Sequence, residues 1–408
     1  MSIGGYFGLD SGQYLYVWLH KNYLVIIMRR CIYCGERKEL TKFSLEHIFP
    51  QSLGGSSLSN LFKTHHVCRY CNSIIGQWVD GSFIRNWFTQ NFKASIANVY
   101  IDSQGNCILP LSYMGRVKRF ETSEQEICEF WLGPCGDSIY HFHDAFDSRY
   151  DTFVGGNPIN LKKNPGDVYI IAVPTNPFWQ KIVFNSFISH FNKARRFICN
   201  APDENNGEWI FSKSSEKEKA IIKILMEARG TDHEVNNLID PYSHERFLAK
   251  IALGLGFNIF GDKYLETDYA QFLRDILWRK KPNNTSELKR FLGYFDPVGE
   301  SLKVILPWEG AHTFLIMSIG DYFILCMCIY GKAFLNVVIS DERSLWSDHK
   351  NYSDGQIFLV VPQLSKALNP ISLPIYISHK LQELPAKELQ ELEALKIDPS
   401  TLPPYVNE

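Results

Sequence analysis

The chain has 408 residues, a length that favours two or three domains over one. Its apolar share of 45% and charged share of 21% are those of a globular protein, which argues against long disordered tracts. The formal net charge of −2 gives no chain-wide basic character, so any surface for nucleic acid must be local.

An interrupted apolar stretch occupies the first residues. Residues 13–28 are mostly apolar, but His20, Lys21 and Asn22 break the run and no small-residue cleavage site follows. The run is also too short to span a bilayer. We therefore expect a cytoplasmic protein without a membrane partner, in which residues 1–28 are an N-terminal extension. Met28 is an alternative start, and the sequence does not decide between the two.

A segment rich in Cys, His, Gly and Asn follows at residues 29–95. It contains two C-x-x-C pairs, Cys31 with Cys34 and Cys68 with Cys71. Each pair offers two thiolates at a spacing that suits a tetrahedral zinc ion, and two pairs without a disulfide context indicate a four-thiolate site. Such a site has no open position for a substrate water, so this zinc is expected to be structural.

Residues within and just after the insert between these pairs offer ligands of another kind. Glu46 supplies a carboxylate and Asn72 an amide oxygen, which suit Mg²⁺ or Mn²⁺ better than zinc. His47, beside the carboxylate, can deprotonate a water near neutral pH. Phosphodiester hydrolysis needs these parts, a divalent ion on the phosphate and a base for the attacking water. We expect a strand with Glu46 and His47 to lie against a helix that opens at Asn72.

These elements resemble the HNH endonuclease family, in the variety whose ββα-metal fold is held by a four-cysteine zinc site. The elements occur in order over residues 30–82: E-H-I-F-P at 46–50, G-G at 54–55, N-L at 60–61 and C-R-Y-C-N at 68–72. The resemblance implies that Glu46 and Asn72 hold a catalytic Mg²⁺ or Mn²⁺. It also implies that His47 is the general base and that Asn60 orients it.

The sequence departs from the family pattern in two places. Glu46 stands where Asp is commoner, and its longer side chain still reaches a metal. The stretch 60–72 is a few residues longer than in compact members, which puts Asn60 in question. It leaves His65 and His66 as alternatives for phosphate contact, although solvated loop residues are the preferred interpretation. Basic residues outnumber acidic ones between 29 and 72: Arg29, Arg30, Arg37, Lys38, Lys42, Lys63 and Arg69 against Glu36, Glu39 and Glu46.

The body at residues 96–380 is expected to mix strands and helices. Short strands are predicted at 97–101, 107–111, 117–120 and 168–173. Helices are predicted at 214–229, with Ser215 as the cap, and at 241–255, 268–279 and 286–292. Strands return at 303–306, 312–319, 322–329, 334–339 and 356–361, with turns at 320–321 and 331–332. A charged amphipathic helix at 382–395 and a Pro-rich tail make up a C-terminal segment, residues 381–408.

Three groups outside the cysteine-rich segment have less specific patterns. The basic clusters 193–196 and 279–281 are typical of solvated faces. His141 and His143 alternate on one strand face and could bind a metal, but a partly buried pair beside aromatic residues is the preferred interpretation. Cys326 and Cys328, in an apolar run, are interpreted as core residues.

The predicted fold class is α+β, with a small zinc-stapled ββα-metal module followed by a larger mixed α/β body. The body would serve regulation, specificity or oligomerisation, and a homo-oligomer is compatible with this plan. The predicted activity is metal-dependent endonucleolytic cleavage of DNA, with RNA left open. The resemblance suggests bacterial genome defence or restriction. The alternative is a zinc ribbon that binds nucleic acid without cutting, although such a ribbon has no need for Glu46, His47 and Asn72 together.

Overall fold

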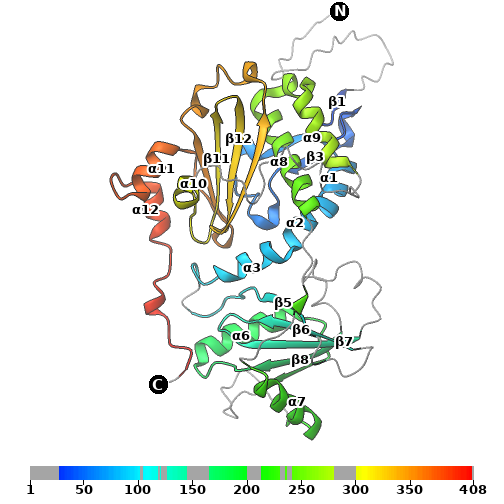
Figure 1. The fold of residues 1–408 in the computed structure, drawn as a ribbon, viewed down its shortest axis with the longest axis vertical. Coiled ribbons are helices and arrows are strands. Elements are labelled where there is room, and N and C mark those ends of the chain that lie inside the picture. Colours follow the sequence, from blue (N-terminus) through cyan, green and yellow to red (C-terminus); the bar gives the residue numbers. More distant parts are fainter. Residues whose placement is uncertain are drawn as a thin grey trace, which may run out of the picture.

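The structure is a computed structural model that describes residues 27–101, 104–117, 120, 126–144, 165–199, 213–229, 235–236, 241–279 and 300–406. Helices and sheets are mixed along the chain, and the predicted α+β class is confirmed. Figure 1 shows an upper part, built from the N-terminal residues and a C-terminal sheet, and a lower part built around a second sheet. No helix in the described ranges is long and apolar enough to cross a membrane.

The N-terminal residues form two small hairpins and a helix. The first hairpin pairs β1 (Met28–Arg30) with β2 (Arg37–Glu39), and the second pairs β3 (Phe43–His47) with β4 (Lys63–Cys68), both antiparallel. Helix α1 (Arg69–Ile75) follows β4 directly. It leads through a π-helical turn at Gly76–Asp80 into α2 (Gly81–Arg85) and α3 (Trp87–Ser95). The expected strand-against-helix arrangement is therefore present, although α1 opens at Arg69 rather than at Asn72.

The C-terminal sheet has the strand order β13-β12-β11-β14-β15, with β16 paired to β14. Its strands are β11 (His312–Ile319), β12 (Tyr322–Ile329), β13 (Ala333–Ser340), β14 (Gln356–Val361), β15 (Lys366–Ala367) and β16 (Ile371–Ser372). The helices of this region are α8 (Pro241–Phe260), α9 (Asp268–Trp278), α10 (Glu300–Ile305), α11 (Leu373–Lys380) and α12 (Lys387–Glu393). Gly320 and Gly331 have positive φ values of 56° and 68°, which the two predicted hairpin turns require.

One hydrophobic core joins the N-terminal module to the C-terminal sheet. The ring of Phe49 lies 4.8 Å from that of Phe314, and the ring of Phe62 lies 5.3 Å from that of Phe358. On the helical side, Phe83 stacks on Phe247 of α8 at 3.8 Å. Packing against α8 and the C-terminal sheet therefore stabilises the module independently of the four cysteines. The domain boundaries at 29–95 and 96–380 stay a prediction, but the core of the module continues into residues 247–392.

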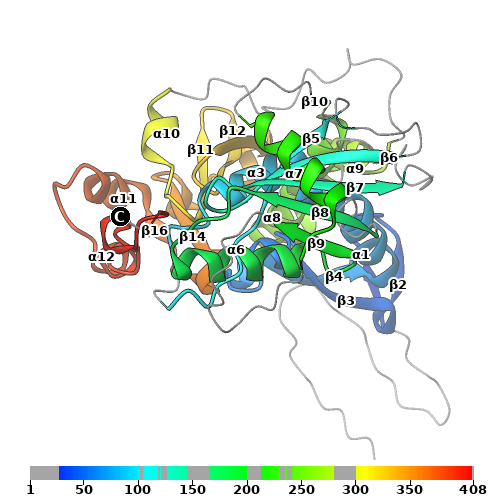
Figure 2. The ribbon, with the colours of Figure 1, turned by 90° about the horizontal axis from the view of Figure 1, so that it is seen from below.

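The second sheet has the order β10-β5-β6-β7-β8-β9 (Figures 1 and 2). Its strands are β5 (Ser112–Val117), β6 (Glu126–Leu132), β7 (Ser138–Asp144), β8 (Gly166–Ile171), β9 (Arg196–Cys199) and β10 (Val235–Asn236). Helices α6 (Pro177–His190) and α7 (Glu216–Glu227) contribute to different hydrophobic clusters, one on each face of the sheet. A capping box at Ser215 and Glu218 begins α7, as predicted.

Among the described residues, helix α3 and the C-terminal segment both contact the lower part. In α3, Asn91 Nδ2 donates to the carbonyl of Tyr113 in β5 at 3.0 Å. The C-terminal segment returns from α12 to the lower part, as Figure 1 shows in red. There Trp179 Nε1 donates to the carbonyl of Pro403 at 2.6 Å, and the Trp179 ring lies 4.8 Å from that of Tyr405.

Several predicted elements differ from the structure. Residues 303–306 lie in helix α10 and its end, because a four-residue apolar run has no periodicity that separates strand from helix. Residues 97–101 form turns after α3, and residues 107–111 precede strand β5 without pairing. The helix expected at 382–395 is shortened to α12, since Pro385 lies inside it. Only Val117 of the strand expected at 117–120 belongs to β5. The helix expected at 286–292 lies outside the described residues.

Candidate functional site

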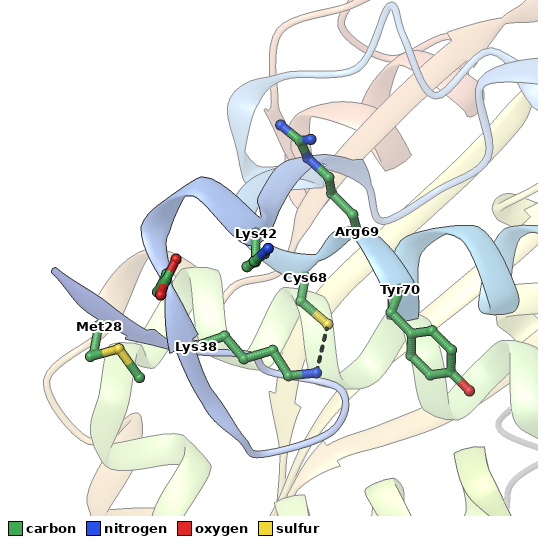
Figure 3. Close-up of a pocket in the computed structure, with 7 residues that line it drawn as sticks. Met28, Lys38, Lys42, Cys68, Arg69 and Tyr70 are labelled. Carbon is green, nitrogen blue, oxygen red and sulfur yellow. Dashed lines mark hydrogen bonds between the residues drawn. The ribbon is translucent and has the colours of Figure 1, made fainter. Parts of the chain in front are cut away.

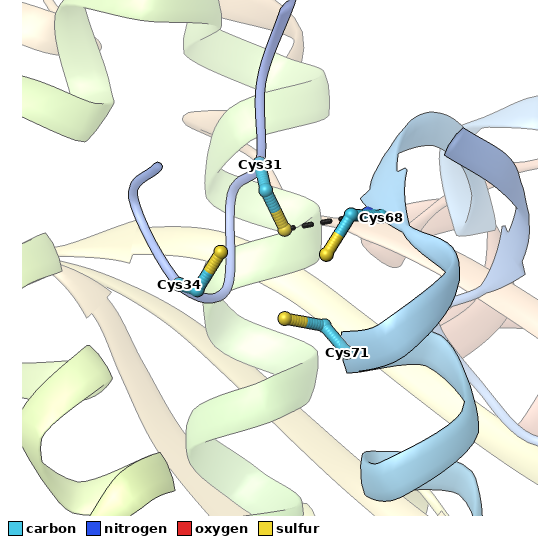
Figure 4. A group of neighbouring side chains, drawn as sticks. All are labelled: Cys31, Cys34, Cys68 and Cys71. Carbon is cyan, nitrogen blue, oxygen red and sulfur yellow. Dashed lines mark hydrogen bonds between the residues drawn. The ribbon is translucent and has the colours of Figure 1, made fainter. Parts of the chain in front are cut away.

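The two C-x-x-C pairs come together at the start of the module (Figure 4). Cys31 and Cys34 lie on the turn between β1 and β2, while Cys68 ends β4 and Cys71 lies in the first turn of α1. Their four sulfur atoms all lie within 4.8 Å of one another. Gly35, with φ of 74°, gives the first knuckle the left-handed turn that a side chain would disfavour. The backbone N–H of Cys68 donates to Cys31 Sγ at 3.4 Å.

This donor set fits a zinc ion. Zinc–sulfur bonds of about 2.3 Å in a tetrahedron place the sulfurs about 3.8 Å apart, which is compatible with the upper limit of 4.8 Å between the sulfurs here. A hydrogen bond with Cys71 lowers the pKa of Cys31 to about 5, while burial raises the pKa of Cys34 to about 11. Lys38 Nζ lies 3.5 Å from Cys68 Sγ, where its charge offsets that of a thiolate. The four cysteines could therefore hold zinc, and a closed four-sulfur site is structural.

Strand β3 places Glu46 and His47 in different surroundings. The pairing of β3 with β4 shifts register between Ser44 and Glu46, so the strand does not alternate regularly there. Leu45 is 42% exposed, whereas Glu46 is only 4% exposed. Tyr33 Oη donates to Glu46 Oε1 at 3.3 Å, and Lys250 Nζ lies 2.8 Å from the same oxygen. Glu46 thus points into the protein and is ion-paired.

His47 ends β3 and stays half-buried. The side-chain amide nitrogen of Gln51, in the 3-10 turn Gln51–Leu53, lies 2.9 Å from His47 Nδ1 and 3.2 Å from Nε2. Burial lowers the pKa of His47 from its ordinary value, and the charge of Lys63 lowers it further. The imidazole is therefore neutral near pH 7, the form that can accept a proton.

Asn72 in α1 lies across the same strand. Its Nδ2 donates to Ser44 Oγ at 3.1 Å and to the carbonyl of Leu45 at 2.9 Å. One turn earlier, Arg69 Nε donates to the carbonyl of Phe43 at 3.4 Å. These bonds fix α1 against β3 beside Glu46 and His47. Because Nδ2 is used on the strand, Oδ1 is the atom of Asn72 that can serve a ligand.

The cysteine cluster, the β3–β4 hairpin and α1 together fit one known family. Residues 31–88 match the HNH endonuclease family. The matched stretch contains both cysteine pairs, Glu46, His47 and Asn72. No curated protein and no solved structure matches the chain.

Asn60 lies elsewhere on the HNH module. It opens the 3-10 turn Asn60–Phe62 and is exposed. Among the described residues, no hydrogen bond joins it to His47, and Gln51 is the side chain that contacts the ring. His66 packs against Phe257 with ring centres 4.5 Å apart, and burial lowers its pKa to about 4. These contacts mark His66 as a packing residue.

The site also contains residues that the motif does not include. Lys250 Nζ lies 2.6 Å from Asp80 Oδ2 and donates to the carbonyl of His47 at 3.2 Å. Burial raises the pKa of Asp80 to about 6. The signal in the sequence was a single lysine within the apolar run 247–257, where a lysine needs a buried partner. Gln51 offered no such signal, because a glutamine after a proline is ordinary on a loop.

A hollow of about 440 Å³ lies beside the two C-x-x-C turns of the HNH module, which are the candidate zinc knuckles (Figure 3). The lining residues are Met28, Lys38, Glu39, Lys42, Cys68, Arg69 and Tyr70. Tyr70 is 65% exposed, and Lys38 Nζ lies 6.0 Å from the centre of its ring. Three cations against one carboxylate, next to an exposed aromatic ring, can bind phosphate and stack on a base.

Proposed function

We propose that the chain is a metal-dependent endonuclease that hydrolyses phosphodiester bonds in DNA. The observation that carries the proposal lies within the matched HNH segment: His47 ends β3, and Asn72 is hydrogen-bonded across that strand from α1. The two residues thus lie on one hairpin-and-helix unit. Glu46 and Asn72 are the proposed ligands of Mg²⁺ or Mn²⁺, and His47 is the proposed base.

The oxygen atoms of the site suit a hard divalent ion. Glu46 Oε1 is held by Lys250 and Tyr33, and Oε2 is the oxygen that a metal would use. Asn72 Oδ1 is the second donor, since its nitrogen is bonded to the strand. A bound divalent ion would act as a Lewis acid on the scissile phosphate.

His47 supplies the base in this proposal. Its lowered pKa keeps the ring neutral near pH 7, so it can take a proton from an attacking water. Gln51 holds the ring in one orientation through its side-chain amide. The orienting role that the family pattern gives to Asn60 stays a prediction, and Gln51 is the residue whose position supports that role.

The substrate is proposed to cross the face that carries Lys42, Arg69 and Tyr70. These side chains line the hollow beside the zinc knuckles, and α1 carries both Arg69 and Asn72. Backbone phosphates would contact the cations without regard to sequence. Because the net charge of the chain is −2, attraction of DNA would have to come from a local group of cations such as this one.

One observation favours a second candidate function, a zinc ribbon that binds nucleic acid without cutting it. Glu46 is 4% exposed and paired with Lys250, so its charge is already compensated without a metal. In this alternative Glu46 would be purely structural. An assay for DNA cleavage distinguishes the endonuclease from the ribbon that only binds.

The test is cleavage of supercoiled plasmid by the full chain with Mg²⁺, Mn²⁺ or EDTA. The variants are His47→Ala and Asn72→Ala, and His65→Ala is the matched control because His65 is an exposed histidine of the same module. We expect nicking or linearisation that needs a divalent ion, is lost in the first two variants and persists in the control. Plasmid binding with no cleavage by the zinc-loaded wild type would support the ribbon instead. The same assay with single-stranded RNA as the substrate shows whether the chain cuts DNA, RNA or both.

A further inference from the structure

Helix α8 of the C-terminal part sends a lysine into the HNH module. Lys250 is 0% exposed and lies at the centre of three contacts. Its Nζ lies 2.6 Å from Asp80 Oδ2, 2.8 Å from Glu46 Oε1 and 3.2 Å from the carbonyl oxygen of His47. An ammonium group has three N–H donors, and here each has an acceptor. Lys250 therefore has no donor left for a substrate phosphate.

The helix is held close to the module along its length. A Cβ on Gly254 would lie 2.7 Å from a side-chain carbon of Ile48, so only glycine permits this approach. Further along, Asn258 Nδ2 donates to the carbonyls of Leu61 and Lys63, at 2.8 and 2.9 Å. These contacts fix the position of Lys250 relative to the residues that follow β3.

The contacts of Lys250 fall on the proposed metal ligand and on the backbone of the proposed base. Within the described part of the chain, both hydrogen-bond partners of the Glu46 side chain use Oε1, and Oε2 receives none. Lys250 also pairs with Asp80, so its ammonium group contacts two carboxylates, those of Glu46 and Asp80. Because the carboxylate is planar and rigid, an ion pair between Lys250 and Oε1 also fixes the direction in which Oε2 of Glu46 points.

We propose that Lys250 is a positioning residue of the nuclease site. It fixes the rotamer of Glu46, which leaves Oε2 as the oxygen that would hold a divalent ion, and it restrains the backbone at His47. This inference rests on the proposed function. It gives α8 a direct part in the site, which residues 29–95 alone would leave incomplete.

The test measures Mn²⁺ binding to the zinc-loaded full chain by electron paramagnetic resonance, alongside cleavage at increasing Mn²⁺. The main variant is Lys250→Met with Asp80→Asn, which removes the cation together with one of its carboxylates. Lys263→Met is the control, because Lys263 is an exposed lysine just after α8. Glu46→Gln removes a proposed ligand, so the part of the Mn²⁺ resonance signal that is lost in this variant is assigned to the proposed metal site. Zinc content and melting temperature report folding of each variant.

We expect the double variant to bind Mn²⁺ at least tenfold more weakly, with a matching rise in the Mn²⁺ concentration for half-maximal cleavage. The rate at saturating Mn²⁺ should stay within a few-fold of the wild type, whereas a general loss of structure would lower it at every concentration. Lys263→Met should match the wild type. If the double variant does not fold, Asp80→Asn alone takes its place, with weaker Mn²⁺ binding expected.

Unchanged Mn²⁺ affinity in the folded variant would overturn the inference and leave the proposed function standing. Tighter Mn²⁺ binding with faster cleavage would also overturn it, since Lys250 would then compete with the ion. A wild type that neither binds Mn²⁺ at Glu46 nor cuts would reject the proposed function, and with it the inference.

Discussion

The side-chain amide nitrogen of Gln51 lies 2.9 Å from Nδ1 of His47. The two residues are four positions apart, on either side of the Pro50 turn that follows β3. A short turn thus brings the amide back onto the imidazole. The orientation of His47 depends on local chain geometry as well as on the hairpin partner β4.

Gln51→Ala should slow cleavage of supercoiled plasmid by about tenfold, less than the hundredfold or more expected for loss of the base in His47→Ala. The substitution leaves His47 in the chain but removes the amide that contacts its imidazole, so the ring can rotate. Initial rates at saturating Mn²⁺ measure the effect. Gln77→Ala, at an exposed glutamine of the same module, is the control. Equal rates for Gln51→Ala and wild type would show that the ring needs no such support.

Cys68→Ser should lower bound zinc to well below one ion per chain and reduce the melting temperature. Cys68 joins β4 to α1, so losing its thiolate loosens the helix that carries Asn72 and the strand that pairs with β3, where His47 lies. Atomic absorption and thermal melting measure the two effects. Cys135→Ala, at a cysteine outside the cluster, should keep the zinc. Full zinc content in Cys68→Ser would contradict a four-cysteine site.

His312 should make the free energy of unfolding depend on pH. Burial lowers its pKa to about 3, against an ordinary value of about 6.5 in the unfolded chain. Between these values the unfolded chain binds the extra proton, so stability falls as the pH drops below about 6.5. The loss is at most about 1.4 kcal/mol per pH unit.

Comparison of wild type with His312→Asn isolates this contribution. Chemical denaturation at pH 5, 6 and 7 should show the difference between the two proteins shrinking as the pH falls, because only the wild type has this histidine to protonate. A constant difference across this range would mean that His312 takes up its proton as readily in the folded protein as in the unfolded chain.

Lys42→Ala should weaken plasmid-DNA binding three- to tenfold and lower the slope of log affinity against log salt by about one. The reason is the loss of one phosphate contact at the hollow beside the zinc knuckles. Titrations at several salt concentrations, with EDTA present to stop cleavage, measure both values. Lys350→Ala, at an exposed lysine outside the module, is the control. An unchanged salt slope would place the DNA elsewhere.

Much of the fold followed from local patterns in the sequence. Strands β11 and β12 have the predicted bounds, because the two mostly apolar runs are separated by the turn residues Gly320 and Asp321. Helices α8 and α9 begin where expected, at Pro241 and Asp268. The cysteine cluster was predicted from spacing alone. In each case, the deciding residues are near neighbours in the chain.

The surroundings of Glu46 could not be predicted in the same way. Its partner Lys250 lies 204 positions later, and nothing in a single sequence pairs the two. The motif predicts a metal-ligand role for Glu46, which stays a prediction, but it does not encode the contact of its side chain with Lys250 of α8. The shared core behind the hairpin was missed for the same reason, since Phe49 meets Phe314 across a long stretch of chain.

The core that the HNH module shares with α8 and the C-terminal sheet limits which segments of this chain can be moved into another protein. Phe49, Phe62 and Phe83 have their packing partners in α8 and in the C-terminal sheet. Transplanting the HNH module alone into another protein would leave these rings without a complementary surface, and the recipient would inherit a poorly packed nuclease. The unit that keeps its core intact is instead the module together with α8 and the C-terminal sheet, the segments that flank the β5–β9 sheet in the chain.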